Sequence, residues 1–379
     1  MRINKHKEDC CGCSACAQIC PQKAISLVPD VLGFKYPVID DKLCIDCGLC
    51  VKVCQFKTDY QTFEVHDPEI YAFRNKDEDQ LLRSQSGAAF WTLAKSIIKE
   101  GGVVYGVGFA DNFRVVHKRV TTLEALEELR GSKYVQSDVC NTFLETKNDL
   151  KQGLKVLYSG TSCQIAGLKA YVGKNLRKNL YSIDLVCHGV PSPKIWEEYL
   201  KVNPFIIKYN NQDVICIKFR DKEKGWSSSV TSFSTKNNKY FSTSYSNIFY
   251  SGLALRESCF LCPYTNFNRV SDITVADFWG WDKVSDLFQD NKGISLLMVN
   301  SDKGQYLLDM VRDEIYLISS DRKSCMQHNL SAPSVRNHLR SEFEADYALY
   351  GYDYVTKKYF SKSFFKRVKN KLKRILKLI

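Results

Sequence analysis

The chain has 379 residues, 44% of them hydrophobic and 25% charged, which is typical of a soluble globular protein with about two or three domains. The formal net charge of +12 comes almost entirely from ten Lys or Arg residues, with no acid, between 357 and 379. Because the rest is nearly neutral and has no aromatic-studded basic stripe, we expect no nucleic-acid partner.

The N-terminus lacks the apolar core of a signal peptide, and no apolar run reaches the roughly 18 residues of a membrane span. These features predict a protein of the reducing cytoplasm. Its 16 cysteines are therefore expected to serve metal or redox sites rather than disulfides.

Two cysteine runs with the spacing C-x2-C-x2-C-x3-C begin 34 residues apart. In two-cluster ferredoxins, the fourth cysteine of each such run binds the other cluster. We therefore predict two [4Fe–4S] clusters, one held by Cys10, Cys13, Cys16 and Cys54 and the other by Cys44, Cys47, Cys50 and Cys20. Structural zinc and disulfides are the alternatives, but zinc prefers two separated pairs of ligands. Cys11 breaks the spacing, and Gln55 stands where the first run has Pro21.

The pattern changes along the chain from short strands to strand–loop–helix units. Short strands are expected over 24–28 and 33–39, and the polar stretch 57–70 predicts a domain boundary. Further on, we expect helices over 86–100, 121–129, 165–171, 303–313 and 335–347, strands over 103–109, 154–158 and 181–186, and an antiparallel insertion over 213–243. The strand–loop–helix units predict a mostly parallel sheet with ligand-holding loops at the carboxyl ends of its strands.

A second set of cysteines lies in loops. Cys163 and Cys187 each follow a predicted strand, while Cys259 and Cys262 form a C-x2-C pair before a proline. Four thiolates converging from such loops would suit a third [4Fe–4S] cluster. A zinc site and unrelated buried cysteines remain the alternatives that the spacing leaves open. Cys216 is expected in the core of a strand, and Cys140 and Cys325 carry no signal.

Longer motifs surround these cysteines: Gly131–Val135 (GSKYV), Gly160–Gln164 (GTSCQ), Asp184–Ser192 (DLVCHGVPS), Phe219–Lys222 (FRDK) and Asp272–Gly280 with its DFWG ending. On these motifs the chain resembles the coenzyme F(420) hydrogenase/dehydrogenase beta-subunit family, preceded by a ferredoxin-type domain. The resemblance implies an FAD-containing iron–sulfur domain that exchanges electrons with a redox partner protein or a small carrier such as coenzyme F(420). It also implies that the third cluster is held by Cys163, Cys187, Cys259 and Cys262.

Two loops depart from the usual family sequence. Ser162 replaces the proline of G-T-P-C-Q, and Ala88 replaces the second glycine of S-G-G. The resemblance implies that Ser86, Gly87, Lys133 and Tyr134 contact the flavin. His188, next to Cys187, is a candidate proton donor to substrate or a hydrogen-bond partner of a cluster sulfur.

Together these patterns predict an α+β or α/β protein. We expect a small bacterial-ferredoxin-like domain over 1–60, a mixed α/β flavin and iron–sulfur domain over 68–350, and a basic amphipathic helix over 357–379. Phe364, Val368 and Leu372 share one face of that helix, which predicts binding to an anionic membrane surface at its cytoplasmic side; docking on protein is the alternative.

Two functions follow from the resemblance. The first is an iron–sulfur flavoprotein oxidoreductase with its own substrate. The second is an electron-transfer subunit that feeds a separate catalytic partner.

Overall fold

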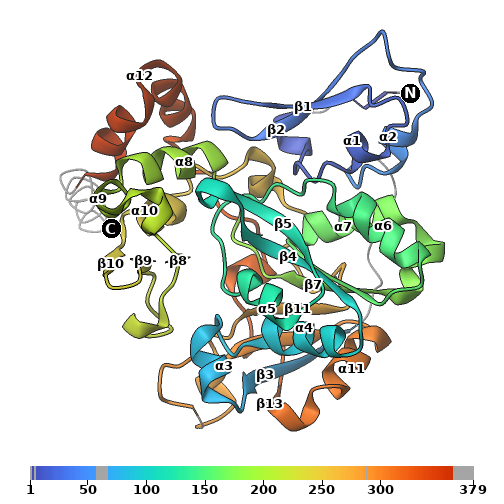
Figure 1. Cartoon of the computed structure of the whole chain (residues 1–379), viewed down its shortest axis with the longest axis vertical. Coiled ribbons are helices and arrows are strands. Elements are labelled where there is room, and N and C mark those ends of the chain that lie inside the picture. Colours follow the sequence, from blue (N-terminus) through green and yellow to red (C-terminus); the bar gives the residue numbers. More distant parts are fainter. Residues whose placement is uncertain (1, 4–5, 57–66, 287, 362–379) are drawn as a thin grey trace, which may run out of the picture.

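The computed structural model describes residues 2–3, 6–56, 67–286 and 288–361. An N-terminal module (residues 6–56) lies beside a larger body (residues 67–361), as Figure 1 shows. Most of the predicted domain boundary, residues 57–66, lies outside the described residues. The same holds for residues 362–379 of the predicted basic helix. No helix in the described part of the chain is both long and apolar enough to cross a membrane.

The N-terminal module contains two short helices and one hairpin. Its helices are α1 (Ala15–Ile19) and α2 (Leu49–Lys52), and its strands are β1 (Ile25–Pro29) and β2 (Lys35–Ile39). β1 pairs antiparallel with β2, which confirms the two predicted strands. Asp30 Oδ1 accepts hydrogen bonds from the backbone N–H groups of Leu32 and Phe34 and so closes the turn between them.

The body is built on one eight-stranded sheet. Its strands are β3 (Glu69–Asn75), β4 (Val103–Phe109), β5 (Val115–Val120), β6 (Val156–Ser159), β7 (Leu180–Leu185), β11 (Ile273–Asp277), β12 (Ser295–Val299) and β13 (Ile315–Ser320), in the order β13-β3-β12-β11-β7-β6-β4-β5. The central strands β11, β7, β6 and β4 run parallel. All pairings outside them are antiparallel.

The prediction of a mostly parallel sheet is therefore wrong. β5 and β12 were not predicted as strands. β5 returns beside β4 after the short connection 110–114, whereas β12 returns beside β11 after the longer connection 278–294. A short connection can join antiparallel strands only, whereas parallel neighbours need a crossover.

Helices cover both faces of this sheet (Figure 1). The α-helices of the described body are α3 (Glu78–Arg83), α4 (Ala89–Lys99), α5 (Leu123–Leu126), α6 (Thr142–Lys151), α7 (Ser162–Val172), α8 (Pro193–Val202), α9 (Pro204–Asp213), α10 (Ser244–Tyr250), α11 (Asp302–Asp309) and α12 (Arg340–Phe360). On one face, α4 and α11 pack against Leu157 of β6. On the other, α6 and α7 pack against Val156, because neighbouring residues of a strand point to opposite faces.

Residues 216–242 form a separate three-stranded sheet. β8 (Cys216–Lys218), β9 (Thr231–Ser234) and β10 (Lys239–Ser242) pair antiparallel in the order β10-β9-β8, which confirms the predicted insertion. Cys216 is half-buried in β8.

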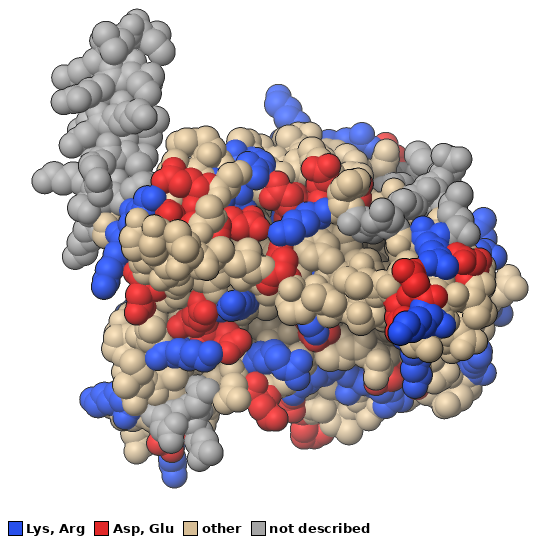
Figure 2. Space-filling view, turned by 90° about the horizontal axis from the view of Figure 1, so that it is seen from above, with Lys and Arg blue, Asp and Glu red and all other residues tan. Residues whose placement is uncertain are grey.

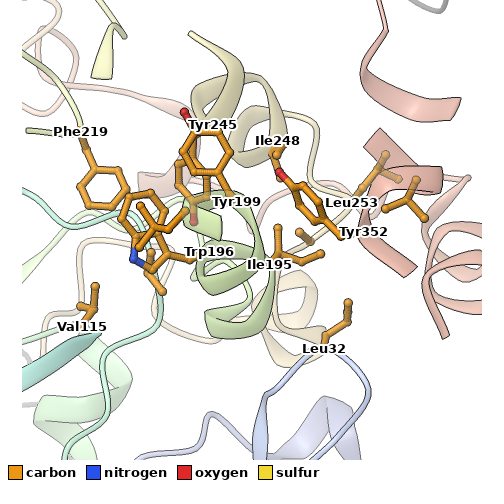
Figure 3. Close-up of a cluster of buried hydrophobic side chains, with 14 of the residues drawn as sticks. Leu32, Val115, Ile195, Trp196, Tyr199, Phe219, Tyr245, Ile248, Leu253 and Tyr352 are labelled. Atoms are coloured by element: carbon orange, nitrogen blue, oxygen red, sulfur yellow. The ribbon is translucent and has the colours of Figure 1, made fainter. Parts of the chain in front are cut away.

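The turn of the N-terminal hairpin is part of the body's core. Leu32 and Phe34 are 0% and 1% exposed and belong to the same hydrophobic cluster as Ile195 and Trp196 of α8. Figure 3 shows Leu32 reaching from the hairpin toward the helix that carries Ile195. Each fully buried side chain of this size contributes about 1.5–3 kcal/mol, so the hairpin fixes the N-terminal module onto the body.

The surface carries mixed charge. Figure 2 shows acidic and basic side chains interspersed over the face seen from above. This mixture is expected for a body whose net charge is close to zero once the tail is set aside.

Asp184 in β7 and Arg269 before β11 form a buried ion pair. Their side chains are 0% and 1% exposed, and Arg269 Nη2 lies 2.8 Å from Asp184 Oδ2. The other carboxylate oxygen accepts hydrogen bonds from Ser271 Oγ at 2.7 Å and Thr274 Oγ1 at 2.5 Å. Both oxygens of the carboxylate thus have partners, which is the condition under which a buried charge is tolerated.

We predict that Arg269→Ala lowers the free energy of unfolding by about 3–5 kcal/mol, because Asp184 is left as an unpaired buried carboxylate. Chemical denaturation of the purified protein measures this change. The matched control, Arg312→Ala at an exposed position, should change the stability by less than about 0.5 kcal/mol. An Arg269→Ala protein as stable as the control would contradict the role given to the ion pair.

Candidate functional site

The regularly spaced cysteines of the N-terminal module fall into two groups. The distal set, Cys20, Cys44, Cys47 and Cys50, lines one pocket. The proximal set gathers around Cys16, which has the thiols of Cys13, Cys10 and Cys54 as neighbours. In each set the fourth cysteine comes from the other run, as the crossed pattern of two-cluster ferredoxins requires.

The two sets differ in their access to solvent. Cys16 is buried. Burial is the main cause that raises the pKa of its thiol well above the usual range, and the neighbouring thiols add to it. Cys47 of the distal set is exposed and is flanked by Leu43 and Ile45, which are 50% and 60% exposed. The distal set therefore faces the surface and the proximal set faces the interior.

Cys163, Cys187, Cys259 and Cys262, here called the inner set, line one cavity. Cys163 lies in the first turn of α7, Cys187 follows β7, and the other two lie in or just after the 3-10 helix Glu257–Leu261. α7 starts at Ser162, earlier than the predicted helix 165–171, so Cys163 is helical and not in a loop. The reason is a capping box between Thr161 and Gln164.

Polar hydrogens point at the sulfurs of the inner set. The backbone N–H of Gly189 donates to Cys187 Sγ at 3.3 Å, and that of Val190 donates to Cys259 Sγ at 3.4 Å. Thr161 Oγ1 lies 3.1 Å from Cys163 Sγ. Hydrogen bonds of this kind tune the reduction potentials of iron–sulfur clusters.

Arg269 connects the segments that carry the inner set. Its Nη2 donates to Ser162 Oγ at 2.8 Å and to the Leu185 carbonyl at 3.2 Å, while Nη1 donates to the Tyr264 carbonyl at 2.7 Å. Each acceptor is one or two residues from a cysteine of the set. Ser162, which departs from the family's proline, thus supplies a hydroxyl that proline lacks.

A second arginine, Arg256, lies between the proximal and inner sets. It is 0% exposed, lines the inner cavity, and reaches Cys10 through Nε to the carbonyl at 2.6 Å and Nη2 to Sγ at 3.6 Å. Its Nη1 donates to Gln136 Oε1 at 3.0 Å. A buried guanidinium needs negative charge close by, and iron-bound thiolates carry such charge.

The thiols of two of the sets line cavities. Among the described residues, no group of three or more His, Cys, Asp or Glu is placed to hold a metal ion. The distal and inner sets each surround a cavity. Thiolates around a cavity fit the separate corners of a [4Fe–4S] cluster.

One cysteine that the spacing leaves out, Cys11, also lines the cavity of the inner set. Gln55, the other departure from the ferredoxin run, donates to Cys11 Sγ at 3.1 Å. No spacing rule assigns either residue, because both act across the interface between module and body. Cys140 is exposed, Cys216 lies in β8, and Cys325 lies in the turn after β13.

A polar cluster forms at Asp277, at the end of β11. Asp277 accepts hydrogen bonds from Ser86 Oγ, from Arg220 Nη1 and, at 2.7 Å, from Trp226 Nε1. Tyr134 Oη lies 3.5 Å from Arg220 Nη1. We call these five residues the Arg220–Asp277 cluster; they come from segments far apart in the sequence.

The cluster has a cationic and an aromatic neighbour. Lys222 Nζ donates to the carbonyls of Leu81, at 2.6 Å, and Ser86. Burial lowers the pKa of Lys222 to about 7. Trp279, 49% exposed, stacks on Trp226 with ring centroids 4.8 Å apart. The sequence motifs contained Arg220, Lys222 and Asp277 but did not indicate that they meet.

Two predicted flavin contacts do not join this cluster. Gly87 packs on β3, where an added Cβ would lie 2.0 Å from the Phe73 carbonyl oxygen. Lys133 Nζ donates to the carbonyls of Arg130 at 2.8 Å and Glu128 at 3.2 Å. Ala88 caps α4 with φ of 68°, a left-handed conformation that favours glycine.

His188 lies between the two sites. Its Nδ1 is 3.2 Å from Ser334 Oγ, and its ring is 5.1 Å from that of Phe249. Phe249 stacks on Tyr134 with centroids 4.7 Å apart. The rings of His188, Phe249 and Tyr134, here called the ring chain, therefore connect the residue that follows Cys187 with the Arg220–Asp277 cluster. Burial lowers the pKa of His188.

Both sites stand at the same edge of the sheet. Cys163, Cys187 and Asp277 lie at or beyond the carboxyl ends of the parallel strands β6, β7 and β11. Ligands bind at this edge in open α/β sheets. Asp272 lies at the opposite end of β11. It accepts hydrogen bonds from Ser182 and Ser301 and so joins neighbouring segments of the fold.

Comparisons with known proteins agree with the motifs. Residues 9–58 match the model of the 4Fe-4S dicluster domain, and residues 153–324 match that of the C terminus of the coenzyme F420 hydrogenase/dehydrogenase beta subunit. A search of curated proteins finds no match. A chain of the F420-reducing [NiFe] hydrogenase complex from Methanosarcina barkeri aligns with 16% identity and a TM-score of 0.48, over 79% of this chain and 92% of that one. On these matches, residues 153–324 are similar to the C terminus of coenzyme F420 hydrogenase/dehydrogenase beta subunits, and residues 9–58 are similar to 4Fe-4S dicluster domains.

Proposed function

We propose that the protein is an iron–sulfur flavoprotein oxidoreductase that passes electrons between three [4Fe–4S] clusters, FAD and a substrate or carrier. The observation that carries this proposal is the shared sheet edge. The inner set and the Arg220–Asp277 cluster stand there together, and the ring chain connects them. When bound, the clusters carry single electrons and the flavin exchanges electrons singly or in pairs.

The proposed electron route runs from the exposed cysteine set to the buried ones. The distal set, with exposed Cys47, Leu43 and Ile45, is where a redox partner protein or small carrier docks. The proximal set lies inside it, and the inner set lies beyond Arg256. We assign the third cluster to Cys163, Cys187, Cys259 and Cys262.

The proposed FAD site is the Arg220–Asp277 cluster. Arg220 provides positive charge for phosphate groups or for reduced anionic flavin, and Lys222, whose pKa burial lowers to about 7, gains its charge when such an anion binds beside it. The half-exposed ring of Trp279 offers a stacking surface for a flat ring system. Ser86 and Tyr134 remain proposed flavin contacts because both belong to this cluster. Gly87 lies outside it and packs against β3.

His188 remains our candidate for proton transfer to substrate. It is half-buried, next to Cys187 and in edge contact with Phe249. The alternative function, an electron-transfer subunit without its own substrate, differs in one respect. The protein alone, loaded with clusters and flavin, would then reduce a substrate only when a catalytic partner is added.

We also propose a cytoplasmic protein whose residues 362–379 contact an anionic membrane surface. The support is the sequence: basic residues and apolar residues occupy opposite arcs of the predicted helix. Each basic residue near such a surface contributes about 1 kcal/mol.

We predict that anaerobically purified protein contains about twelve iron atoms and about one flavin. Cys163→Ser and Cys262→Ser should each reduce the iron to about eight, because the inner set loses a ligand. Cys140→Ser, at an exposed position, is the control and should keep all the iron. A wild-type protein with about eight irons, or with zinc in the inner set, would falsify the third cluster.

We predict that Asp277→Asn weakens flavin binding at least about tenfold while the iron content stays the same, because a charge-assisted hydrogen bond contributes about 1.5–3 kcal/mol. Flavin fluorescence after gel filtration measures the loss. Asp282→Asn, on the exposed surface five residues further on, is the matched control. If both variants retain flavin equally, the flavin lies elsewhere.

We predict that a chain ending at Ser361 no longer sediments with anionic lipid vesicles, whereas the full chain does so in a salt-sensitive manner. Neutral vesicles serve as the control and should bind neither form. Sedimentation of the shortened chain with anionic vesicles would place the membrane contact outside the tail.

A further inference from the structure

The backbone at Cys11 is held by two side chains of the body. Gln136 Nε2 donates to the Cys11 carbonyl at 2.8 Å, and Arg256 Nε donates to the Cys10 carbonyl at 2.6 Å. Gly12 follows with φ of +70°, and a Cβ there would lie 2.7 Å from Arg256 Nη1. The turn is thus shaped around these two residues, and it directs Cys11 into the cavity of the inner set.

The Cys11 thiol touches both neighbouring cysteine sets. It is 6% exposed, and the thiols of Cys13 of the proximal set and Cys163 of the inner set are its neighbours. Gln55 Nε2 donates to Cys11 Sγ at 3.1 Å. Since Gln55 supplies a hydrogen to this sulfur, the S–H of Cys11 is free to be donated to a cysteine of either set.

Gln55 itself spans the interface. It follows Cys54 directly in the chain, its Nε2 also donates to the Cys163 carbonyl, and its Oε1 accepts from Tyr264 Oη. Gln55 is 9% exposed. A proline in its place, as at Pro21 of the first run, could make none of these side-chain contacts.

Two departures from the ferredoxin pattern, an extra cysteine and a glutamine in place of proline, therefore meet at one point. That point lies between the proximal and inner sets. Neither residue fits a role within the ferredoxin module alone, because the polar partners of both side chains include groups of the body.

We propose that Cys11 and Gln55 form a hydrogen-bonded bridge between the proximal and inner sets, in which Cys11 tunes the reduction potential of the cluster at Cys163. This inference rests on the third cluster of the proposed function. An S–H donated to an iron-bound thiolate withdraws negative charge from it and favours the reduced state. The bridge itself undergoes no redox change: one electron moves between neighbouring clusters, and no bond breaks and no proton transfers.

The test is an anaerobic redox titration of the full-length holoprotein, followed by electron paramagnetic resonance. Signals of the third cluster are identified as those missing in Cys163→Ser. Cys11→Ala should retain all the iron and change the oxidised-to-reduced ratio of the third cluster about tenfold toward the oxidised form, which is about 59 mV for one electron. Cys11→Ser keeps a donor of nearly the same size and should give an intermediate shift.

Gln55→Leu should shift the third cluster in the same direction as Cys11→Ala, because it removes the donor that orients the Cys11 thiol. Cys216→Ser, in β8, is the matched control and should leave the titration unchanged.

Three results would overturn the bridge, and they are distinguishable. An unchanged titration in Cys11→Ala with all the iron present refutes the tuning role alone. Loss of about four irons in Cys11→Ala means that Cys11 is a ligand. A wild-type protein with about eight irons removes the third cluster, and with it both the proposed function and the bridge.

Discussion

The ion pair between Asp184 and Arg269 is the contact on which the inner cysteine set depends. The cysteines of this set come from three separate segments, and no sequence-local force brings those segments together. Arg269 does so with a planar guanidinium whose N–H groups reach Ser162, Leu185 and Tyr264 at the same time. Only a group with several fixed donors can satisfy acceptors in different directions, which is why lysine would not replace it. The negative charge of Asp184, at the end of a central strand, holds that guanidinium in the interior.

The second constraint is the way in which the N-terminal module is fixed to the body. Leu32 and Phe34 place the hairpin in the body's core, while Arg256 holds the backbone of the first cysteine run. α7 approaches the proximal set closely, since a Cβ at Gly167 would lie 2.8 Å from Cys13 Sγ. The separation between the proximal and inner sets is therefore determined by side-chain packing. Electron transfer between clusters requires such a fixed, short separation, and packing of this kind provides it.

Sequence reasoning succeeded where the signal is local. The two cysteine runs have a spacing with a direct chemical meaning, and the structure groups their thiols in the crossed pattern. The hairpin, the helix over 89–99 and the insertion were also predictable, because turn residues and periodicity identify them. The inner set could be grouped only through the family resemblance, since its members are up to 99 residues apart in the chain.

The remaining features depend on contacts between distant segments. In the sequence, β12 is only an apolar run. Its direction and its neighbours in the sheet come from its pairing with β3 and β11. Arg256, Arg269 and Gln55 have no local signature, because their importance lies in the acceptors that the fold brings to them. Gly87 is a related case: the motif was noticed, but the close approach of the Phe73 carbonyl, which leaves no room for a Cβ, could not be read from the sequence.

We infer that the body holds a cluster of its own at Cys163, Cys187, Cys259 and Cys262. The most direct measurement is anomalous X-ray scattering at the iron and zinc edges from crystals grown anaerobically. We expect iron at three places, the third inside the cavity that these cysteines line beside Cys11. Iron confined to the N-terminal module, or zinc in that cavity, would contradict it.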